Sequence, residues 1–199
     1  MSSLLVAVTG NSGCGQSTVA SVFGSLGAEV CSLDAVGHRL LSRKYVVTDL
    51  AMELSMPELH GRCSEDIRKL LRGEAFSEPG MIEAINRVLH PRMARWCRIA
   101  TAGVRRGQGV FVLEGALVLE MGLSGLFDVI VVVRDTFQRC SQRLQAVYDL
   151  APEVLRGRWE NQLPMDEKAR RADFVLDNSG TLEDLGEKAA TLYRRLSAL

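Results

Sequence analysis

The sequence lacks an excess of charge of either sign. Its 199 residues include 24 lysines and arginines and 24 aspartates and glutamates, so the formal net charge at pH 7 is zero. A chain without net charge has no general attraction for the phosphates of nucleic acid or for an anionic membrane. Aromatic residues are also few, at 6% of the chain, which argues against a surface that stacks nucleobases. We therefore expect no nucleic acid and no membrane among the partners, and any anion must bind at a local site.

The sequence also contains no Cys-x-x-Cys pair and no long apolar run. The five cysteines are Cys14, Cys31, Cys63, Cys97 and Cys140. Their odd number and wide spacing argue against a zinc site and a disulfide framework, so we expect reduced thiols in a cytoplasmic protein. The apolar stretch within MSSLLVAV (1–8) follows no basic segment and is too short for a signal peptide or a membrane span.

Strand-like and helical segments alternate along much of the chain. Strands are predicted at residues 4–8, 28–34, 109–115, 128–133 and 172–178. Helices are predicted at residues 17–26, 136–147 and 151–162, and from a capping box formed by Thr181 and Asp184 to the end. This alternation predicts an α/β fold with a parallel sheet. Ligands of such sheets gather at the carboxyl ends of the strands.

Residues 35–107 differ from this pattern, because charged helical segments follow one another there without a clear strand. Breaks fall near Pro57, Gly61, Gly73 and SEPG (77–80). We expect residues 35–107 to form a helical insertion. The nucleotide-binding core then comprises residues 1–34 and 108–199.

The stretch TGNSGCGQST (9–18) has the layout of a phosphate-binding loop between a strand and a helix. Glycines let successive N–H groups point at a phosphate, and the positive end of the following helix faces the same anion. The hydroxyl of Ser17 is placed to bind Mg²⁺ that accompanies ATP. The candidate nucleotide-binding residues are Asn11, Ser12, Gly13, Cys14, Gly15, Gln16, Ser17 and Thr18. The alternative is a glycine-rich turn that binds no ligand.

Position 16 of this loop carries glutamine, where phosphate-binding loops carry lysine. Gln16 can donate a hydrogen bond but has no charge. A pair of unit charges 4 Å apart is worth roughly 4 kcal/mol at an effective dielectric constant near 20. If half to all of this energy is specific to the transition state, its loss slows phosphoryl transfer by about one and a half to three powers of ten. Nucleotide binding can persist on backbone and Mg²⁺ contacts.

Segments along nearly the whole chain, taken in order with this loop, resemble the dephospho-CoA kinase family. They are ASVFGSLGAEV (20–30), LDAVGHRLL (33–41), FSEPGMIEAINRVLHPRM (76–93), EGALVLEMGL (114–123), RGRWENQ (156–162) and ADFVLDNSG (172–180). Their order and spacing are much more specific than the loop alone.

The resemblance implies a five-stranded parallel P-loop kinase fold of the nucleoside monophosphate kinase type, with a helical acceptor-binding insertion and a helical lid at about residues 140–170. It also implies ATP- and Mg²⁺-dependent phosphorylation of the 3′-hydroxyl of dephospho-CoA, the last step of coenzyme A synthesis. In this family pattern Asp34 is the base that receives the hydroxyl proton. Arg143 matches an arginine of the lid, and Asn178 lies near the nucleotide base.

Four positions depart from the family pattern. Gln16 replaces the loop lysine, Ser32 replaces the first acid of an Asp-x-Asp, and Ala116 stands where proline is usual. Counting back from Gln162, Val147 falls at the place of a second lid arginine. The changes at positions 16 and 147 both remove positive charge from where phosphate charge spreads, and an arginine there can be worth about 10³–10⁵ in rate.

Three functions remain open on the sequence alone. The first is a dephospho-CoA kinase in which other arginines restore the lost charge, and these are Arg139, Arg143, Arg156 and Arg158. The second is a catalytically impaired descendant that binds nucleotide or coenzyme A as a sensor or partner protein. The third is a P-loop kinase for another small acceptor. Asp34 favours the first function, whereas Gln16 and Val147 together favour the second. The oligomeric state stays open.

Overall fold

The chain divides into two compact units. The computed structural model describes residues 2–74, 80–148 and 150–198. One unit comprises Met1–Ser32 and Arg98–Leu199, and the other comprises Leu33–Cys97. The second unit is therefore an insertion in the sequence of the first.

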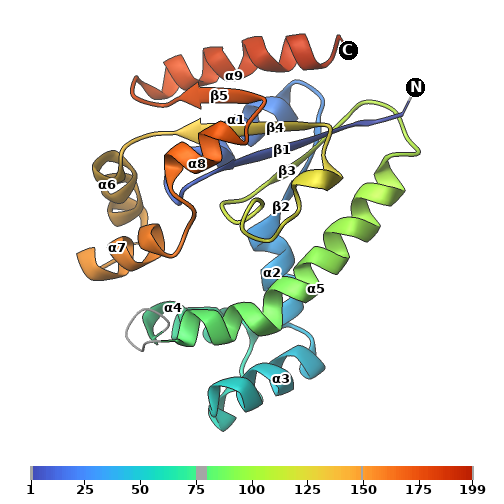
Figure 1. Cartoon of the computed structure of the whole chain (residues 1–199). Coiled ribbons are helices and arrows are strands. Elements are labelled where there is room, and N and C mark those ends of the chain that lie inside the picture. Colours follow the sequence, from blue (N-terminus) through green and yellow to red (C-terminus); the bar gives the residue numbers. More distant parts are fainter. Residues whose placement is uncertain (1, 75–79, 149, 199) are drawn as a thin grey trace. The chain divides into compact units, whose positions relative to one another are not determined.

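A five-stranded parallel sheet forms the centre of the first unit (Figure 1). Its strands are β1 (Leu4–Gly10), β2 (Glu29–Ser32), β3 (Val110–Glu114), β4 (Val129–Arg134) and β5 (Phe174–Asp177). They lie in the order β2-β3-β1-β4-β5, and every neighbouring pair is parallel. The predicted α/β fold with a five-stranded parallel sheet is confirmed.

The central strands read as unbroken apolar runs because both faces of the sheet are covered. In β1 every residue after Leu4 is buried, and β4 is buried from Val129 to Val133. All strands run the same way, so their carboxyl ends share one edge of the sheet. Gly10 ends β1 at this edge, which places the start of the predicted phosphate-binding loop there.

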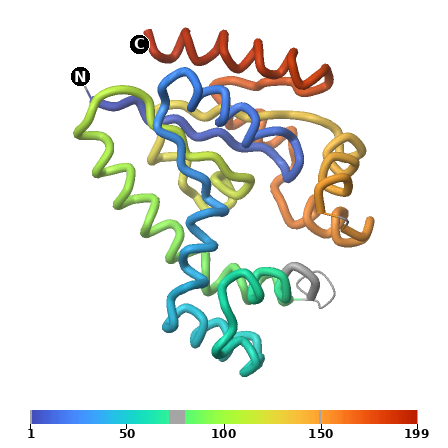
Figure 2. Tube along the Cα trace, turned by 180° about the vertical axis from the view of Figure 1, so that it is seen from behind, coloured from blue at the N-terminus to red at the C-terminus, as the bar shows by residue number. Residues whose placement is uncertain are grey.

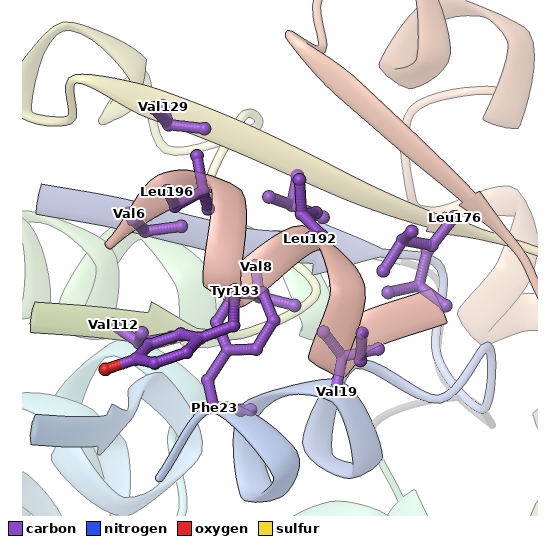
Figure 3. Packing of buried hydrophobic residues seen from close by; sticks show 14 of the residues in the cluster. Val6, Val8, Val19, Phe23, Val112, Val129, Leu176, Leu192, Tyr193 and Leu196 are labelled. Carbon is purple, nitrogen blue, oxygen red and sulfur yellow. The ribbon is translucent and has the colours of Figure 1, made fainter. Parts of the chain in front are cut away.

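Helices α1 (Gln16–Ser25) and α9 (Leu182–Leu196) contact each other and cover one face of this sheet (Figure 2). Phe23 of α1 packs on Tyr193 of α9, with 5.3 Å between the ring centres. Both rings lie over buried valines of the strands, including Val8 and Val112 (Figure 3). This packing fixes the helix that follows the loop against the sheet.

Three further helices of the first unit lie in the region of the predicted lid. They are α6 (Phe137–Tyr148), α7 (Pro152–Glu160) and α8 (Met165–Arg170). Pro152 is the first residue of α7, where proline is tolerated because the N–H it lacks would have no helical partner. The sequence pattern predicted α6 and α7 but not α8.

The second unit is helical and has its own apolar core. Its helices are α2 (Leu33–Leu41), α3 (Lys44–Leu54), the 3₁₀ helix η1 (Pro57–Leu59), α4 (Ser64–Glu74) and the first part of α5 (Met81–Val104). Val46, Leu50, Leu59 and Ile67 are fully buried within it. Residues 75–79 lie outside the described residues, and they include most of the SEPG stretch and the start of segment 76–93.

The strand predicted at residues 28–34 is too long. β2 ends at Ser32, and Asp34 lies in the first turn of α2. Leu33, Val36 and Leu41 are buried and spaced as one face of a helix. Burial of this face outweighs the strand propensity of the preceding residues.

The predicted capping box at the start of α9 is confirmed. The Thr181 hydroxyl accepts the N–H of Asp184 at 3.1 Å, and the Asp184 carboxylate accepts the N–H of Thr181 at 2.7 Å. The hydrogen bonds from the backbone and side chain of Thr181 hold the pKa of Asp184 below its ordinary value. The ionised carboxylate is therefore the form that stabilises the folded chain.

We expect this stabilisation to disappear in acid. A carboxylate with a lowered folded-state pKa contributes fully above its unfolded pKa, near 3.9, and the contribution is lost as pH falls through the folded value. The unfolding free energies of the wild type and Asp184→Ala should differ by a constant amount from about pH 7 to 5 and converge toward about pH 3. Urea unfolding followed by circular dichroism measures this difference. Glu183→Ala, in the same exposed turn, is the control, and a pH-independent gap for Asp184→Ala would contradict the capping role.

Among the described residues, no helix combines the length and the apolar character needed to cross a membrane.

Candidate functional site

The predicted phosphate-binding loop joins β1 to α1. Gly13 and Gly15 have positive φ angles of 82° and 104°, a backbone conformation that glycine adopts without a steric cost. α1 begins at Gln16, and Gly15 before it supplies no side-chain cap. The first N–H groups of an α-helix have no partner within the helix and carry the positive end of its dipole. Ser17 is exposed in this first turn, and Thr18 beside it is half-buried.

Side chains from α6 and from the end of β5 hold two carbonyl groups of the loop. Arg143 donates to the Gly13 carbonyl at 3.2 Å, and Asn178 Nδ2 donates to the Cys14 carbonyl at 2.8 Å. Arg143 also binds the carbonyl of Asn178 at 3.1 Å and the carboxylate of Asp135 at 2.5 Å. Asp135 is buried, so this pair fixes the direction of the guanidinium. The structure thus brings the predicted residues Arg143 and Asn178 to the loop.

Two more donors bind the first carbonyl groups of the loop. Lys168 Nζ from α8 donates to the Gly10 carbonyl at 3.1 Å, and Gln16 Nε2 donates to the Asn11 carbonyl at 2.9 Å. Asn11 and Gln16 are buried. Four carbonyl groups of the loop are therefore occupied by side chains. The Cys14 N–H donates to the Asn11 carbonyl at 3.0 Å, so the first N–H groups of α1 are the ones best placed to bind an anion.

Gln162 binds the loop residue Ser12 through both ends of its carboxamide. Its oxygen accepts the Ser12 N–H at 2.9 Å, and its nitrogen donates to the Ser12 hydroxyl at 3.0 Å. Gln162 is the second residue after the end of α7, following Asn161. The segment after α7 is in this way attached to the same loop as α6 and α8.

Two thiols meet beneath the loop. The sulfur atoms of Cys14 and Cys140 are 2.8 Å apart, and both side chains are buried. Their hydrogen bond lowers the pKa of Cys14 and raises that of Cys140. Cys14 of the loop is therefore the more acidic thiol of the pair.

The buried ammonium of Lys168 pairs with Glu120. Nζ lies 2.8 Å from Glu120 Oε1 and also donates to the Ala116 carbonyl at 2.7 Å. Burial lowers the pKa of Lys168, while the charge and hydrogen bond of Glu120 oppose that effect. The sequence did not predict Lys168 as a site residue. Acidic residues after Pro164 and basic residues toward Arg170 would have predicted α8, but nothing in the sequence marks Lys168 as buried.

Asp34 belongs to the second unit. Its side chain is exposed in the first turn of α2. In the same unit His38 receives a hydrogen bond from Arg68 at Nδ1 and lies 3.0 Å from the Ser64 hydroxyl through Nε2. Nδ1 is thus the acceptor nitrogen, so Nε2 carries the proton and His38 is not a free base toward Ser64.

The arginines proposed to compensate for position 16 differ in their contacts. Arg139 and Arg143 both pair with Asp135, and Arg139 also donates to the Gly180 carbonyl at 3.0 Å. Arg156 lies over the ring of Phe137 at 5.8 Å. Val147, at the expected place of a lid arginine, is 70% exposed. Arg143 contacts the loop itself, at the Gly13 carbonyl.

We expect Gly15→Ala to weaken nucleotide binding. An added Cβ would lie 2.7 Å from Asn178 Nδ2, and the φ of 104° strains any other residue by about 1–2 kcal/mol. Displacing the amide would free the Cys14 carbonyl and reshape the loop. ATP affinity, measured by titration calorimetry, should fall at least about tenfold.

Gly27→Ala is the matched control for this variant. Gly27 has almost the same φ of 107°, but an added Cβ there would make only an ordinary contact, 3.7 Å from the Tyr193 hydroxyl oxygen. It should lose similar stability and keep its ATP affinity. Equal losses of affinity in both variants would show that strain, and not the shape of the loop, is responsible.

No group of three or more histidine, cysteine, aspartate or glutamate side chains that could hold a metal occurs within the described ranges. Ser17 offers an exposed hydroxyl for a metal ion.

The comparisons with known proteins agree on one family. The sequence model described as dephospho-CoA kinase matches residues 4–184. The chain is 32% identical to the dephospho-CoA kinase of Thermus thermophilus over 185 residues, covering 92% of this chain and 86% of the relative. It is 32% identical to that of Deinococcus radiodurans over 190 residues, covering 95% and 90%.

Solved structures give the same fold. A crystal structure from Thermus thermophilus is similar with a TM-score of 0.74 and 30% identity, covering 98% of this chain and 99% of that one. Dephospho-CoA kinase from Campylobacter jejuni gives a TM-score of 0.61 at 20% identity, covering 98% of each. Shikimate kinase from Acinetobacter baumannii, with a TM-score of 0.53 at 13% identity and coverage of 97% and 94%, shares the fold alone.

Proposed function

Because the chain belongs to the dephospho-CoA kinase family, we propose that it transfers the γ-phosphoryl group of ATP to the ribose 3′-hydroxyl of dephospho-CoA. The hydroxyl oxygen bonds to the γ-phosphorus, the bond from that phosphorus to the β-γ bridging oxygen breaks, and ADP and coenzyme A result. The observation that carries this proposal is the loop at Gly10–Gln16. Side chains hold four of its carbonyl groups, and the first N–H groups of α1, which have no partner within the helix, are the proposed donors to phosphate.

The nucleotide phosphates are proposed to bind residues 11–18. The positive φ angles of Gly13 and Gly15 and the N-terminus of α1 suit an anion. Arg143 has five N–H donors, of which three bind Gly13, Asp135 and Asn178. We assign the others to the phosphate charge that develops during transfer. Asn178 supports the loop next to the site proposed for the nucleotide base.

Asp34 is the proposed base for the 3′-hydroxyl proton. It follows the carboxyl end of β2 by two residues and is exposed, and a carboxylate can accept the proton as the new P–O bond forms. The expected insertion at residues 35–107, most of which belongs to the helical second unit, is the proposed binding region for dephospho-CoA.

Mg²⁺ is proposed to accompany ATP, with the Ser17 hydroxyl as its protein ligand. The ion would neutralise part of the phosphate charge when it is bound. The loop residues fit this role, because Ser17 is exposed in the first turn of α1. The cytoplasm is the expected compartment, since the five cysteines are free thiols.

The test is direct conversion of dephospho-CoA. Purified protein is incubated with ATP, Mg²⁺ and dephospho-CoA, and coenzyme A is followed by chromatography with mass detection. Shikimate and gluconate serve as alternative acceptors, because kinases of those compounds share the fold. Coenzyme A formed without phosphorylation of the other acceptors supports the proposal. ATP binding without coenzyme A formation would overturn it and leave a nucleotide-binding protein.

A further inference from the structure

The side chain of Lys168 is a fully buried cation at the root of the loop. Its ammonium has three donors, and all three have acceptors: the carbonyls of Gly10 and Ala116 and the carboxylate of Glu120. Burying an ion pair costs several kcal/mol of desolvation per ion, which its attraction need not recover. Apolar side chains in place of the whole pair are often as stable or more stable, so stability alone does not explain a buried lysine and glutamate here.

The ammonium of Lys168 contacts the start of the loop, in which position 16 lacks the usual lysine. Lys168 and Gln16 donate to consecutive carbonyls, those of Gly10 and Asn11, at the start of the loop. Gln16 is neutral, so the charge at this pair of contacts comes from Lys168. The ammonium also interacts electrostatically with Cys14 of the loop, and this interaction raises the pKa of Lys168.

The partner of Lys168 extends the contact to the segment after α7. Glu120 Oε1 accepts the N–H of Leu163 at 2.9 Å. Leu163 follows Gln162, whose carboxamide binds the backbone and hydroxyl of Ser12. Lys168 contacts the loop directly at Gly10, and through Glu120 it supports the segment that binds the loop at Ser12.

We propose that Lys168 is a positioning residue for phosphoryl transfer. From α8 it supplies, at the start of the loop, the positive charge that position 16 lacks. Through Glu120 and Leu163 it also holds Gln162 against Ser12. This inference rests on the proposed function. It assigns to α8 a contribution that phosphate-binding loops draw from their own lysine.

A double-mutant cycle over positions 16 and 168 tests the proposal. The four proteins are the wild type, Gln16→Lys, Lys168→Met and the double variant. The kcat and KM for dephospho-CoA phosphorylation and the Kd for ATP are measured for each. Lys168→Met should lower kcat about 100-fold when residue 16 is glutamine, but only about threefold when residue 16 is lysine, because the charge is then supplied within the loop.

Equal losses in both backgrounds would overturn the proposal, because a purely structural role does not depend on the charge at position 16. Lys188→Met is the matched control. Lys188 also donates to a backbone carbonyl, that of Asp177 at 2.8 Å, but it is exposed on α9. Its loss should leave kcat within about twofold in both backgrounds.

Folding and function can be separated in this experiment. Circular dichroism checks each variant, and Lys168→Gln, which is neutral but retains N–H donors, replaces Lys168→Met in the cycle if the latter does not fold. If the wild type forms no coenzyme A, the proposed function fails, and the cycle in ATP affinity still decides the role of Lys168. Coupling of at least about fivefold in that Kd supports the role, and additive effects refute it.

Discussion

Asp34→Asn is expected to lower kcat by about 10²–10⁴. Asparagine keeps the shape and polarity of the side chain but cannot receive the proton of the 3′-hydroxyl at neutral pH. Asp34 is exposed at the start of α2, so the substitution removes no buried contact, and the KM for both substrates should change little. Steady-state kinetics with dephospho-CoA as the varied substrate measure both constants.

Asp66→Asn provides the matched control for Asp34. Asp66 is likewise an exposed aspartate in the first turn of a helix of the second unit, α4. Both variants lose a favourable charge at a helix N-terminus, worth about 0.3–1 kcal/mol of stability. Only the change at position 34 should affect kcat. A wild-type rate for Asp34→Asn would assign the proton to another acceptor.

Gln16→Lys is expected to raise kcat by about thirtyfold, near the lower end of the range of one and a half to three powers of ten that a new charge can provide. Gln16 is buried with Nε2 on the Asn11 carbonyl, and a lysine can retain a donor there while bringing an ammonium to the phosphates. The gain is limited because Lys168 already supplies part of the charge. In Lys168→Met the same substitution should therefore gain about 1,000-fold.

Gln16→Met separates charge from shape in this test. Methionine has a similar length but neither charge nor donor, so its kcat should fall below that of the wild type. Single-turnover kinetics show whether any change occurs in the chemical step or in product release. An unchanged rate in Gln16→Lys, with ATP affinity intact, would mean that position 16 does not limit transfer.

Much of the fold follows from local rules that the sequence obeys. The apolar runs of β1 and β4 predicted buried parallel strands, and Thr181 with Asp184 predicted the start of α9. The glycines of the loop predicted its backbone, and Gly13 and Gly15 have the positive φ angles that the loop requires. These features depend on neighbours within a few residues, which is why a sequence can reveal them.

The sequence predicted neither the boundary between β2 and α2 near Asp34 nor the short helix α8. The helical face of Leu33, Val36 and Leu41 becomes decisive only when another element covers it. α8 has six residues, too few for a clear apolar period, and a helix of that length is stable only through its tertiary contacts.

The sequence by itself determined the parallel sheet, the capped final helix and a phosphate-binding loop without its lysine, because each rests on periodicity, capping or the freedom of glycine. Only the tertiary structure showed how distant side chains contact that loop, and it alone identified Lys168 among them. Arg143 reaches it through buried Asp135, and Lys168 reaches Gly10 through a pair with Glu120. In the sequence Lys168 resembles any exposed lysine of a charged helix. Its burial, and therefore the strength of its charge at the loop, arises only where α8 and the segment after β3 enclose it away from water.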